Sequence, residues 1–287
     1  MASTRQGASG PSATTEMISF MPTQRYSPEQ IQSFIQDAKR DGFVVLRDHL
    51  SREKLQGWVE HFPPLLEKQI EVEKDFPNRG AQRFYVTLPF TAPYADPSIY
   101  EDEDVLAIVE ELAGKDFVMC QLATDTPLLG SDYQELHRDT PPLFPEWEVE
   151  TPSFQLAVNF PLVDVTPEMG PFEVARGTHM VSKAEGLRML ETGEVKLEAI
   201  CLALGDVMIR DVRGIHRGTP NRTETPRPMV VIGYSRKWLN RPEVSIRIPR
   251  EEMDKVSERA RRMLRFNPVL ESVEEKPAQE TYQAFAY

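Results

Sequence analysis

The chain has few cysteines, few histidines and no long apolar run. Its two cysteines, Cys120 and Cys201, form no Cys-x-x-Cys pair and lie among apolar residues, which argues against a cysteine zinc or redox site and predicts buried thiols in a reducing compartment. No apolar stretch is long enough to cross a bilayer, and the first residues lack the charged-then-apolar plan of a signal peptide. We therefore expect a cytoplasmic protein with no membrane partner.

Positive charge is also scarce. The 287 residues include 33 Lys and Arg against 45 Asp and Glu, a formal net charge of -12, whereas proteins that neutralise nucleic-acid phosphates usually show the opposite balance or a basic stripe. The nearest approach to a stripe, residues 258–265, lies in a segment with apolar residues at helical spacing. It predicts an amphipathic C-terminal helix with a solvated basic face, and we expect no nucleic-acid partner.

The rest of the composition is ordinary for a globular enzyme, with 40% apolar and 27% charged residues. Residues 1–24 contain few bulky groups and are expected to form a loose tail. The remainder, residues 25–287, is predicted to form a single domain. Its parts are N-terminal helices over 25–115, a β core over 116–240, and a C-terminal helix and tail over 241–287.

Helical patterns dominate the first part of this domain. Ser27 and Gln30 can form a capping box at the start of a first helix. A second helix is expected from Ser51 and should break at Pro63-Pro64, because proline removes a helix hydrogen bond, before a helical pattern resumes. The other elements expected here are a strand at 43–46 and a helix over 102–112.

Beyond residue 116 the pattern changes to short strands separated by Gly, Pro, Asn and Asp. Helices followed by strands indicate an all-β core with flanking helices, most simply a jelly roll, also called a double-stranded β-helix. The strands are expected at 117–123, 153–160, 171–175, 199–203, 206–212 and 228–236.

Two histidines and one aspartate form a candidate metal site. His137 and Asp139 are two residues apart, so in an extended segment both side chains point to one face and can converge on one ion. His216 follows an expected strand, at a Gly/Pro/Asn loop suited to a ligand at the mouth of a barrel. Two His and one carboxylate make the facial triad of non-haem Fe(II) oxygenases, whereas structural zinc closes its shell with four ligands, usually including Cys. His179 competes as third ligand, although a histidine after Gly-Thr is more simply one that fastens a turn.

Three further positions bear on this site. Arg227, eleven residues beyond His216, opens an expected apolar strand and can hold a distal carboxylate through two parallel hydrogen bonds. Arg210, in the strand before His216, is interpreted as a salt-bridge partner of the abundant acids. His49 and His61 are interpreted as surface or capping residues.

Taken together, these motifs resemble the phytanoyl-CoA dioxygenase family of Fe(II)- and 2-oxoglutarate-dependent oxygenases. The resemblance rests on the His-x-Asp pair, the Gly-Thr-His turn at 177–179, the His-Arg-Gly-x-Pro-Asn run at 216–221 and the arginine that opens the next strand. It extends from about Tyr26 to about Trp238. It implies a jelly-roll oxygenase domain that uses Fe(II), 2-oxoglutarate and O₂, with ascorbate as a candidate supporting reductant. The residues it implies are His137, Asp139 and His216 for iron, and Arg227, Gln134 and Asn159 for the cosubstrate.

The same resemblance implies oxidation of an unactivated C–H bond. We expect hydroxylation of a small organic metabolite, in secondary metabolism, because iron halogenases of this architecture replace the aspartate with a small residue and Asp139 is present. The alternatives are an acyl-CoA hydroxylase and a catalytically inactive ligand-binding barrel. The expected partner is a small-molecule substrate, a homodimer is a candidate assembly, and the loops expected to select the substrate are 82–94 and 141–152.

Overall fold

Two antiparallel sheets form the core of the computed structural model, which describes residues 24–75, 79–144, 146, 150–239, 241 and 244–271. In spatial order the larger sheet consists of β1 (Phe43–Leu46), β7 (Val207–Asp211), β4 (Gln155–Pro161), β9 (Met229–Ser235), β3 (Val118–Pro127) and β2 (Arg83–Thr87). The smaller sheet consists of β6 (Leu197–Ile200), β5 (Phe172–Ala175) and β8 (His216–Gly218). The predicted all-β jelly-roll core with flanking helices is confirmed.

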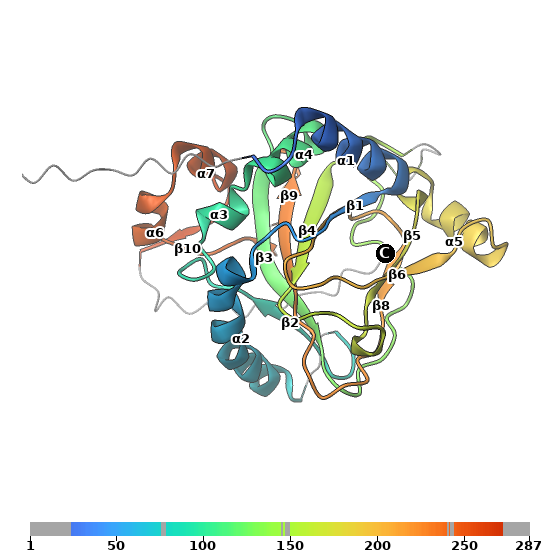
Figure 1. Cartoon of the computed structure of the whole chain (residues 1–287), viewed down its shortest axis with the longest axis horizontal. Helices are drawn as coiled ribbons and strands as arrows, with labels where there is room; N and C mark the ends of the chain where they lie inside the picture. Colours follow the sequence, from blue (N-terminus) through green and yellow to red (C-terminus); the bar gives the residue numbers. More distant parts are fainter. Residues whose placement is uncertain are drawn as a thin grey trace, which may run out of the picture.

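Helices lie around these sheets (Figure 1). Three of them, α1 (Pro28–Asp41), α2 (Arg52–Glu73) and α4 (Glu103–Ala113), place buried apolar residues in the same cluster as the larger sheet. Figure 1 shows α5 (Lys183–Glu191) beside the smaller sheet. The remaining elements are α3 (Pro97–Tyr100), α6 (Arg250–Lys255), α7 (Glu258–Met263), the 3-10 turns at Pro167–Met169 and Thr178–Met180, and a parallel pair of short strands, β10 (Ile248–Pro249) and β11 (Val269–Leu270).

Strand alternation gives the larger sheet two different faces. In β4, Leu156 and Val158 belong to the main apolar cluster, whereas Ala157 and Asn159 line a pocket. Successive side chains of a strand point to opposite faces, so every second residue of β4 faces the helices and the others face the pocket. The neighbouring strands β7 and β9 alternate in the same way. The pocket therefore lies on the side of the larger sheet opposite its packed helices.

The predicted start of the first helix is confirmed in detail. Ser27 Oγ accepts a hydrogen bond from the Gln30 amide at 3.3 Å, and the Gln30 side chain accepts one from the Ser27 amide at 2.9 Å. The expected tail, residues 1–24, lies outside the described residues except for Gln24. The division of the chain into one domain with three parts stays a prediction.

The predicted break at Pro63-Pro64 is wrong, because α2 runs through both prolines. The buried residues Trp58, Phe62 and Leu66 lie on one side of this helix at helical spacing and belong to the main apolar cluster. Packing of this stripe on both sides of the prolines outweighs the local loss of helix hydrogen bonds.

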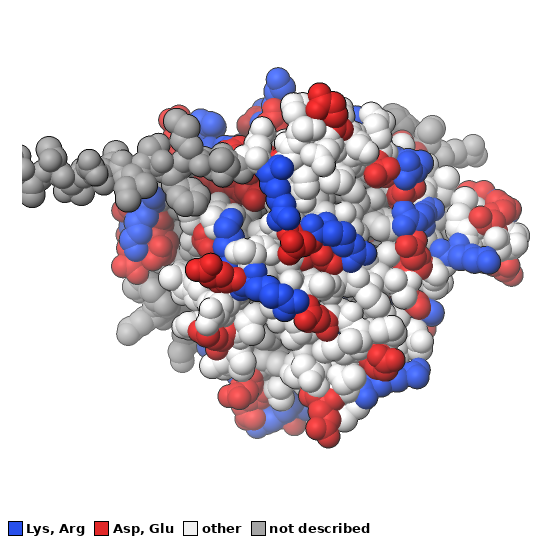
Figure 2. Space-filling model, viewed as in Figure 1, with Lys and Arg blue, Asp and Glu red and all other residues white. Residues whose placement is uncertain are grey.

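The predicted single C-terminal helix is also wrong, because the segment forms two short helices, α6 and α7. Val256 has extended backbone angles, and Ser257 caps α7 by accepting a hydrogen bond from the Ala260 amide at 2.9 Å. Arg259, Arg262 and Arg265 are paired with acids here; Arg259, for example, binds Glu103 at 2.8 Å. On the face shown in Figure 2, basic and acidic side chains are interspersed in the same way. Within the described ranges, no helix is both long and apolar enough to cross a membrane.

Candidate active site

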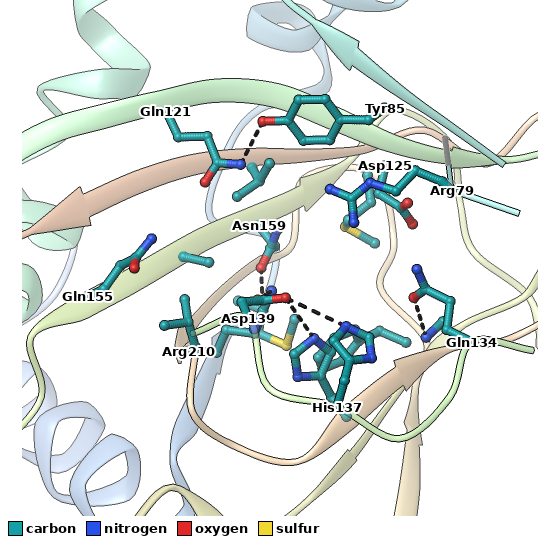
Figure 3. A pocket seen from close by; sticks show the side chains of 18 of the residues that line it. Arg79, Tyr85, Gln121, Asp125, Gln134, His137, Asp139, Gln155, Asn159 and Arg210 are labelled. Atoms are coloured by element: carbon teal, nitrogen blue, oxygen red, sulfur yellow. Dashed lines mark hydrogen bonds and ion pairs between the residues drawn. The ribbon is translucent and has the colours of Figure 1, made fainter. Parts of the chain in front are cut away.

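The donor atoms of His137, Asp139 and His216 meet in one place. Asp139 Oδ1 lies 3.6 Å from His137 Nε2 and 3.3 Å from His216 Nε2, and the three ligand atoms all lie within 4.8 Å of one another. Both histidines are buried. Figure 3 shows the aspartate and the two imidazole rings converging at one side of the pocket. The predicted trio is thus brought together in space.

Main-chain pairing sets this geometry. The segment with His137 and Asp139 runs beside the one with His216, and the amides of His137 and His216 each donate to the other's carbonyl oxygen at 3.0 Å. The Asp139 amide donates to Val212 O at 3.0 Å. The His-x-Asp spacing then puts both side chains on the same face as His216.

Both imidazole rings are oriented for metal binding. Nδ1 of His137 lies 2.7 Å from Glu135 O, and Nδ1 of His216 lies 2.8 Å from Gly214 O. A carbonyl oxygen only accepts, so Nδ1 carries the proton in each ring and Nε2 presents its lone pair to the site. Burial lowers the pKa of His216 to about 4, which keeps this ring neutral at pH 7.

Asp139 is held ionised by a neighbouring arginine. Arg210 Nη2 donates to Asp139 Oδ2 at 2.7 Å, which leaves Oδ1 facing the two histidines. Burial opposes ionisation, but neighbouring groups outweigh it, Arg210 most of all, and the pKa of Asp139 lies well below its usual range. Two imidazoles and one carboxylate with open space beside them suit a divalent metal with vacant positions.

Arg227 lies in the same pocket, two residues before β9 begins. Its side chain is 2% exposed, and burial lowers its pKa to about 10, although nearby Asp125 raises it. Nη2 lies 3.8 Å from Asp125 Oδ2, an oxygen that also accepts from Arg83 at 2.8 Å. Arg227 Nε is buried and has no hydrogen-bond partner among the described residues. A buried guanidinium with an unused donor fits a carboxylate ligand.

The two other predicted cosubstrate residues also line this pocket. Gln134 Oε1 accepts from the Gly218 amide at 2.9 Å, and in Figure 3 the amide nitrogen points towards Asp125. Asn159 is held at both ends, because Nδ2 donates to Val230 O at 2.9 Å and Oδ1 accepts from Arg210 Nε at 3.1 Å. Asn159 is therefore bonded to the side chain that pairs with Asp139.

The part of the pocket across from the metal group, called the outer pocket below, is lined by Tyr85, Gln121, Gln155 and Arg241 and is polar (Figure 3). Gln121 Nε2 donates to the Tyr85 hydroxyl at 2.7 Å, and Arg241 donates to Gln155 at 3.2 Å. Figure 3 shows Tyr85, Gln121 and Gln155 across the pocket from His137. Two segments, 82–94 and 141–152, were expected to be loops that select the substrate. The first contributes Tyr85, which lies in β2, whereas Leu143, Phe144, Thr151 and Pro152 of the second line a separate, mainly apolar hollow.

Arg210 forms a salt bridge, as predicted, but the sequence did not show that its partner is the candidate metal ligand Asp139. The signal was available: Met208, Arg210 and Val212 are two residues apart and line the pocket together. Asp125 was also missed, since its place beside Arg227 depends on pairing between strands far apart in sequence.

The remaining histidines lie elsewhere. His179 is buried and does not belong to the metal group. Its ring packs against Gly42, so that a Cβ atom added to Gly42 would lie only 2.7 Å from His179 Nδ1. His61 is exposed, as predicted. His49 is not a surface residue: it is buried, and Nε2 lies 3.0 Å from Asp102, which also caps α4. With Asp104 it forms a second His and carboxylate group, in which Asp104 accepts a hydrogen bond from the Arg25 amide at 2.8 Å.

The jelly roll and the His-Asp-His group define the class as a non-haem, 2-oxoglutarate-dependent oxygenase. A sequence model of the phytanoyl-CoA dioxygenase (PhyH) family matches residues 38–229, a range that includes all six predicted site residues. The chain belongs to this family, which confirms the resemblance and makes it an enzyme of the Fe(II)/2-oxoglutarate dioxygenase type.

Solved structures agree with this fold. The α-ketoglutarate-dependent carbocyclase SnoK from nogalamycin biosynthesis is 18% identical, with a TM-score of 0.56 over 74% of this chain and 85% of that chain. EctD from S. alaskensis, with bound Fe, is 20% identical, with a TM-score of 0.56 over 76% of this chain and 83% of that chain. HygX from Streptomyces hygroscopicus, with nickel, 2-oxoglutarate and hygromycin B bound, is 17% identical. Its TM-score is 0.53 over 75% of this chain and 89% of that chain.

Proposed function

We propose that this protein hydroxylates an unactivated C–H bond of a small organic metabolite in secondary metabolism, using Fe(II), 2-oxoglutarate and O₂. The observation that carries the proposal is the convergence of His137, Asp139 and His216 in a pocket shared with Arg227. The trio supplies a facial ligand set, and the arginine supplies a buried anchor for a dicarboxylate.

His137 and His216 would hold Fe(II) through Nε2, and Asp139 through Oδ1. A facial set of three protein ligands leaves three adjacent positions free for cosubstrate and O₂. When bound, the iron with 2-oxoglutarate and O₂ supplies the oxidant for the C–H bond. The protein contributes ligand geometry, fixed by Nδ1 hydrogen bonds and Arg210, and a pocket that keeps the oxidant near its substrate.

Arg227 would hold the C5 carboxylate of 2-oxoglutarate. Its Nε is the unpaired donor, and neutralisation by a carboxylate would offset the burial that lowers its pKa. Gln134 would donate a hydrogen bond to 2-oxoglutarate from its amide nitrogen, since its amide oxygen already accepts from the Gly218 amide. Asn159 would act through Arg210.

A polar small molecule fits the outer pocket best, because Tyr85, Gln121 and Gln155 present hydroxyl and amide groups there. The named neighbours from nogalamycin biosynthesis and with hygromycin B bound support a natural-product substrate. Asp139 fills the position where halide would need space, which supports hydroxylation. The family's description makes acyl-CoA hydroxylation the second candidate.

The test is substrate-dependent succinate formation by the Fe(II)-loaded protein, measured with O₂ uptake across natural products and acyl-CoA thioesters. The proposal expects succinate and a product heavier by one oxygen atom with a polar metabolite. Activity confined to acyl-CoA would favour the second candidate. Bound iron without 2-oxoglutarate-dependent O₂ uptake would indicate an inactive ligand-binding barrel.

A further inference from the structure

Arg210 has most of its guanidinium committed beside the metal group. Nη2 donates to Asp139 Oδ2 at 2.7 Å, and Nε donates to Asn159 Oδ1 at 3.1 Å. The group also lies over the Phe172 ring, 5.0 Å from its centroid. Phe172 in turn packs on His216 at 4.9 Å between ring centroids. These contacts fix the plane of the guanidinium.

The third nitrogen of Arg210 is unused. Nη1 is buried and has no hydrogen-bond partner within the described part of the chain, and Arg210 lines the pocket that holds the metal donors. Buried donors on charged groups are nearly always paired, so an acceptor is expected when the pocket is filled. Because Nη2 donates to Asp139 and Nε to Asn159, Nη1 is the nitrogen left to donate to another acceptor.

Neighbouring Arg213 shows what a purely structural arginine looks like here. Its Nε and Nη2 donate to Asp211, its Nη1 donates to Thr151 O, and it does not line the pocket. Arg210 differs in both respects, since one nitrogen is open and the side chain faces the cavity. A salt bridge to Asp139 alone does not account for this arrangement.

The pocket therefore has two cationic anchors at different distances from the metal group. Arg210 is bonded directly to a candidate metal ligand, whereas Arg227 is bonded to none of the three and lies beside Asp125. A 2-oxo acid bound at the metal through its first carboxylate and keto oxygen has that carboxylate close to Asp139. Its far carboxylate has to reach the more distant arginine.

We propose that Arg210 is the second carboxylate anchor of this site. Nη1 binds the C1 carboxylate of the 2-oxo acid next to the metal, while Nη2 holds Asp139 so that only Oδ1 faces the ion. Asn159 is the positioning residue that orients the guanidinium for both contacts. This inference rests on the proposed use of 2-oxoglutarate.

The test is calorimetric titration of the Ni(II)-loaded protein, which binds 2-oxo acids without turnover. Two ligands separate the anchors: 2-oxoglutarate carries both carboxylates, and 2-oxobutyrate carries only the one next to the keto group. The variants are Arg210→Gln, Arg210→Lys and Arg227→Gln. Arg217→Gln is the control, because Arg217 follows a candidate metal ligand but pairs with Glu173 and does not line the pocket.

Arg210→Gln should weaken both acids by about tenfold or more, the size expected for a lost charge-assisted hydrogen bond. Arg227→Gln should weaken 2-oxoglutarate by a similar factor and leave 2-oxobutyrate unchanged. Arg210→Lys keeps a charge for Asp139, but its one nitrogen replaces the planar fork that presents Nη1 and Nη2 to two acceptors at once. It should therefore retain Ni(II) and still bind 2-oxobutyrate poorly. The control should match the wild type.

Wild-type affinity for 2-oxobutyrate in a Ni(II)-loaded Arg210→Lys or Arg210→Gln protein would overturn the assignment of Arg210. Weakening of 2-oxoglutarate alone by these variants would also overturn it, since Arg210 would then hold the far carboxylate. Failure of the Ni(II)-loaded wild type to bind 2-oxoglutarate would reject the proposed function along with this inference.

Discussion

His137 and His216 are joined through their main chains, each amide donating to the other's carbonyl oxygen at 3.0 Å. This pairing connects residues far apart in the sequence and brings two Nε2 atoms to within 3.6 Å and 3.3 Å of the same Asp139 oxygen. The relative position of the two histidines is therefore set by main-chain pairing of residue 137 with the first residue of β8.

Replacing a metal donor should abolish iron binding. His137→Ala removes one of three ligands, and Asp139→Ala removes the only carboxylate, so neither variant should retain Fe(II) after anaerobic loading and desalting. His61→Ala is the matched control, because His61 is exposed and should leave the iron content unchanged. Full iron content in the His137→Ala protein would remove it from the ligand set.

Removing the distal anchor should affect the cosubstrate more than the metal. Arg227→Ala should raise the 2-oxoglutarate concentration needed for half-maximal O₂ uptake by about 10- to 100-fold, the range for loss of a charged hydrogen-bond pair. Iron content should stay at the wild-type value, since Arg227 contacts none of the three donors. An unchanged 2-oxoglutarate requirement would contradict the role of Arg227.

The sequence predicted the parts of this site that depend on residues close together in the chain, and it missed contacts between residues far apart in the chain. His-x-Asp spacing is local, so the shared direction of His137 and Asp139 was readable, and Arg227 was placed by its position at a strand start. The contact of Arg210 with Asp139 needs the register of distant strands, as does that of Asp125 with Arg227. Composition and spacing do not carry that register.

The fold shows the same limit. The capping box at Ser27 is local and was predicted correctly, whereas the continuity of α2 depends on tertiary packing of Phe62 and Leu66. The missing amide donors of Pro63 and Pro64 predicted a break in the helix, but tertiary packing keeps it continuous. The cap at Ser257 that divides the C-terminal segment was present in the sequence, but the apolar spacing across it gave a stronger signal for one helix.

The prolines of α2 supply a stability prediction. Both are exposed and lie inside a helix that runs through them, so Pro63→Ala with Pro64→Ala should restore two amide donors and improve helix propensity. We expect the free energy of unfolding in urea to rise by about 1–3 kcal/mol. A loss of stability would show that the prolines fit a bend that the packing requires.

The buried Asp211–Arg213 pair should make stability depend on pH. Burial opposes ionisation of Asp211, but hydrogen bonding to Arg213 at 2.7 Å outweighs it and lowers the pKa of the folded carboxyl. A depressed folded pKa adds stability that is present above the unfolded value of about 3.9 and is lost as pH falls through the folded value. Asp211→Asn should therefore be less stable than wild type at pH 7, by about 3–5 kcal/mol for a broken buried pair.

That difference in unfolding free energy should start to shrink as the pH falls below about 4, because the carboxyl of the unfolded wild type then binds a proton while the folded carboxyl, with its lowered pKa, stays ionised. Thermal unfolding followed by circular dichroism from pH 3 to pH 8 measures it. A gap of constant size across this range would mean that Asp211 is not held ionised by Arg213.

The central claim is that His137, Asp139 and His216 present a metal to a 2-oxo acid anchored in the same pocket. Anaerobic titration of the Fe(II)-loaded protein with 2-oxoglutarate, followed by visible absorption, tests it most directly, because chelation of Fe(II) by a 2-oxo acid gives a charge-transfer band. The account predicts a band that saturates at one equivalent in the wild type and is absent in His216→Ala. An iron-loaded wild type with no band at saturating 2-oxoglutarate would contradict it.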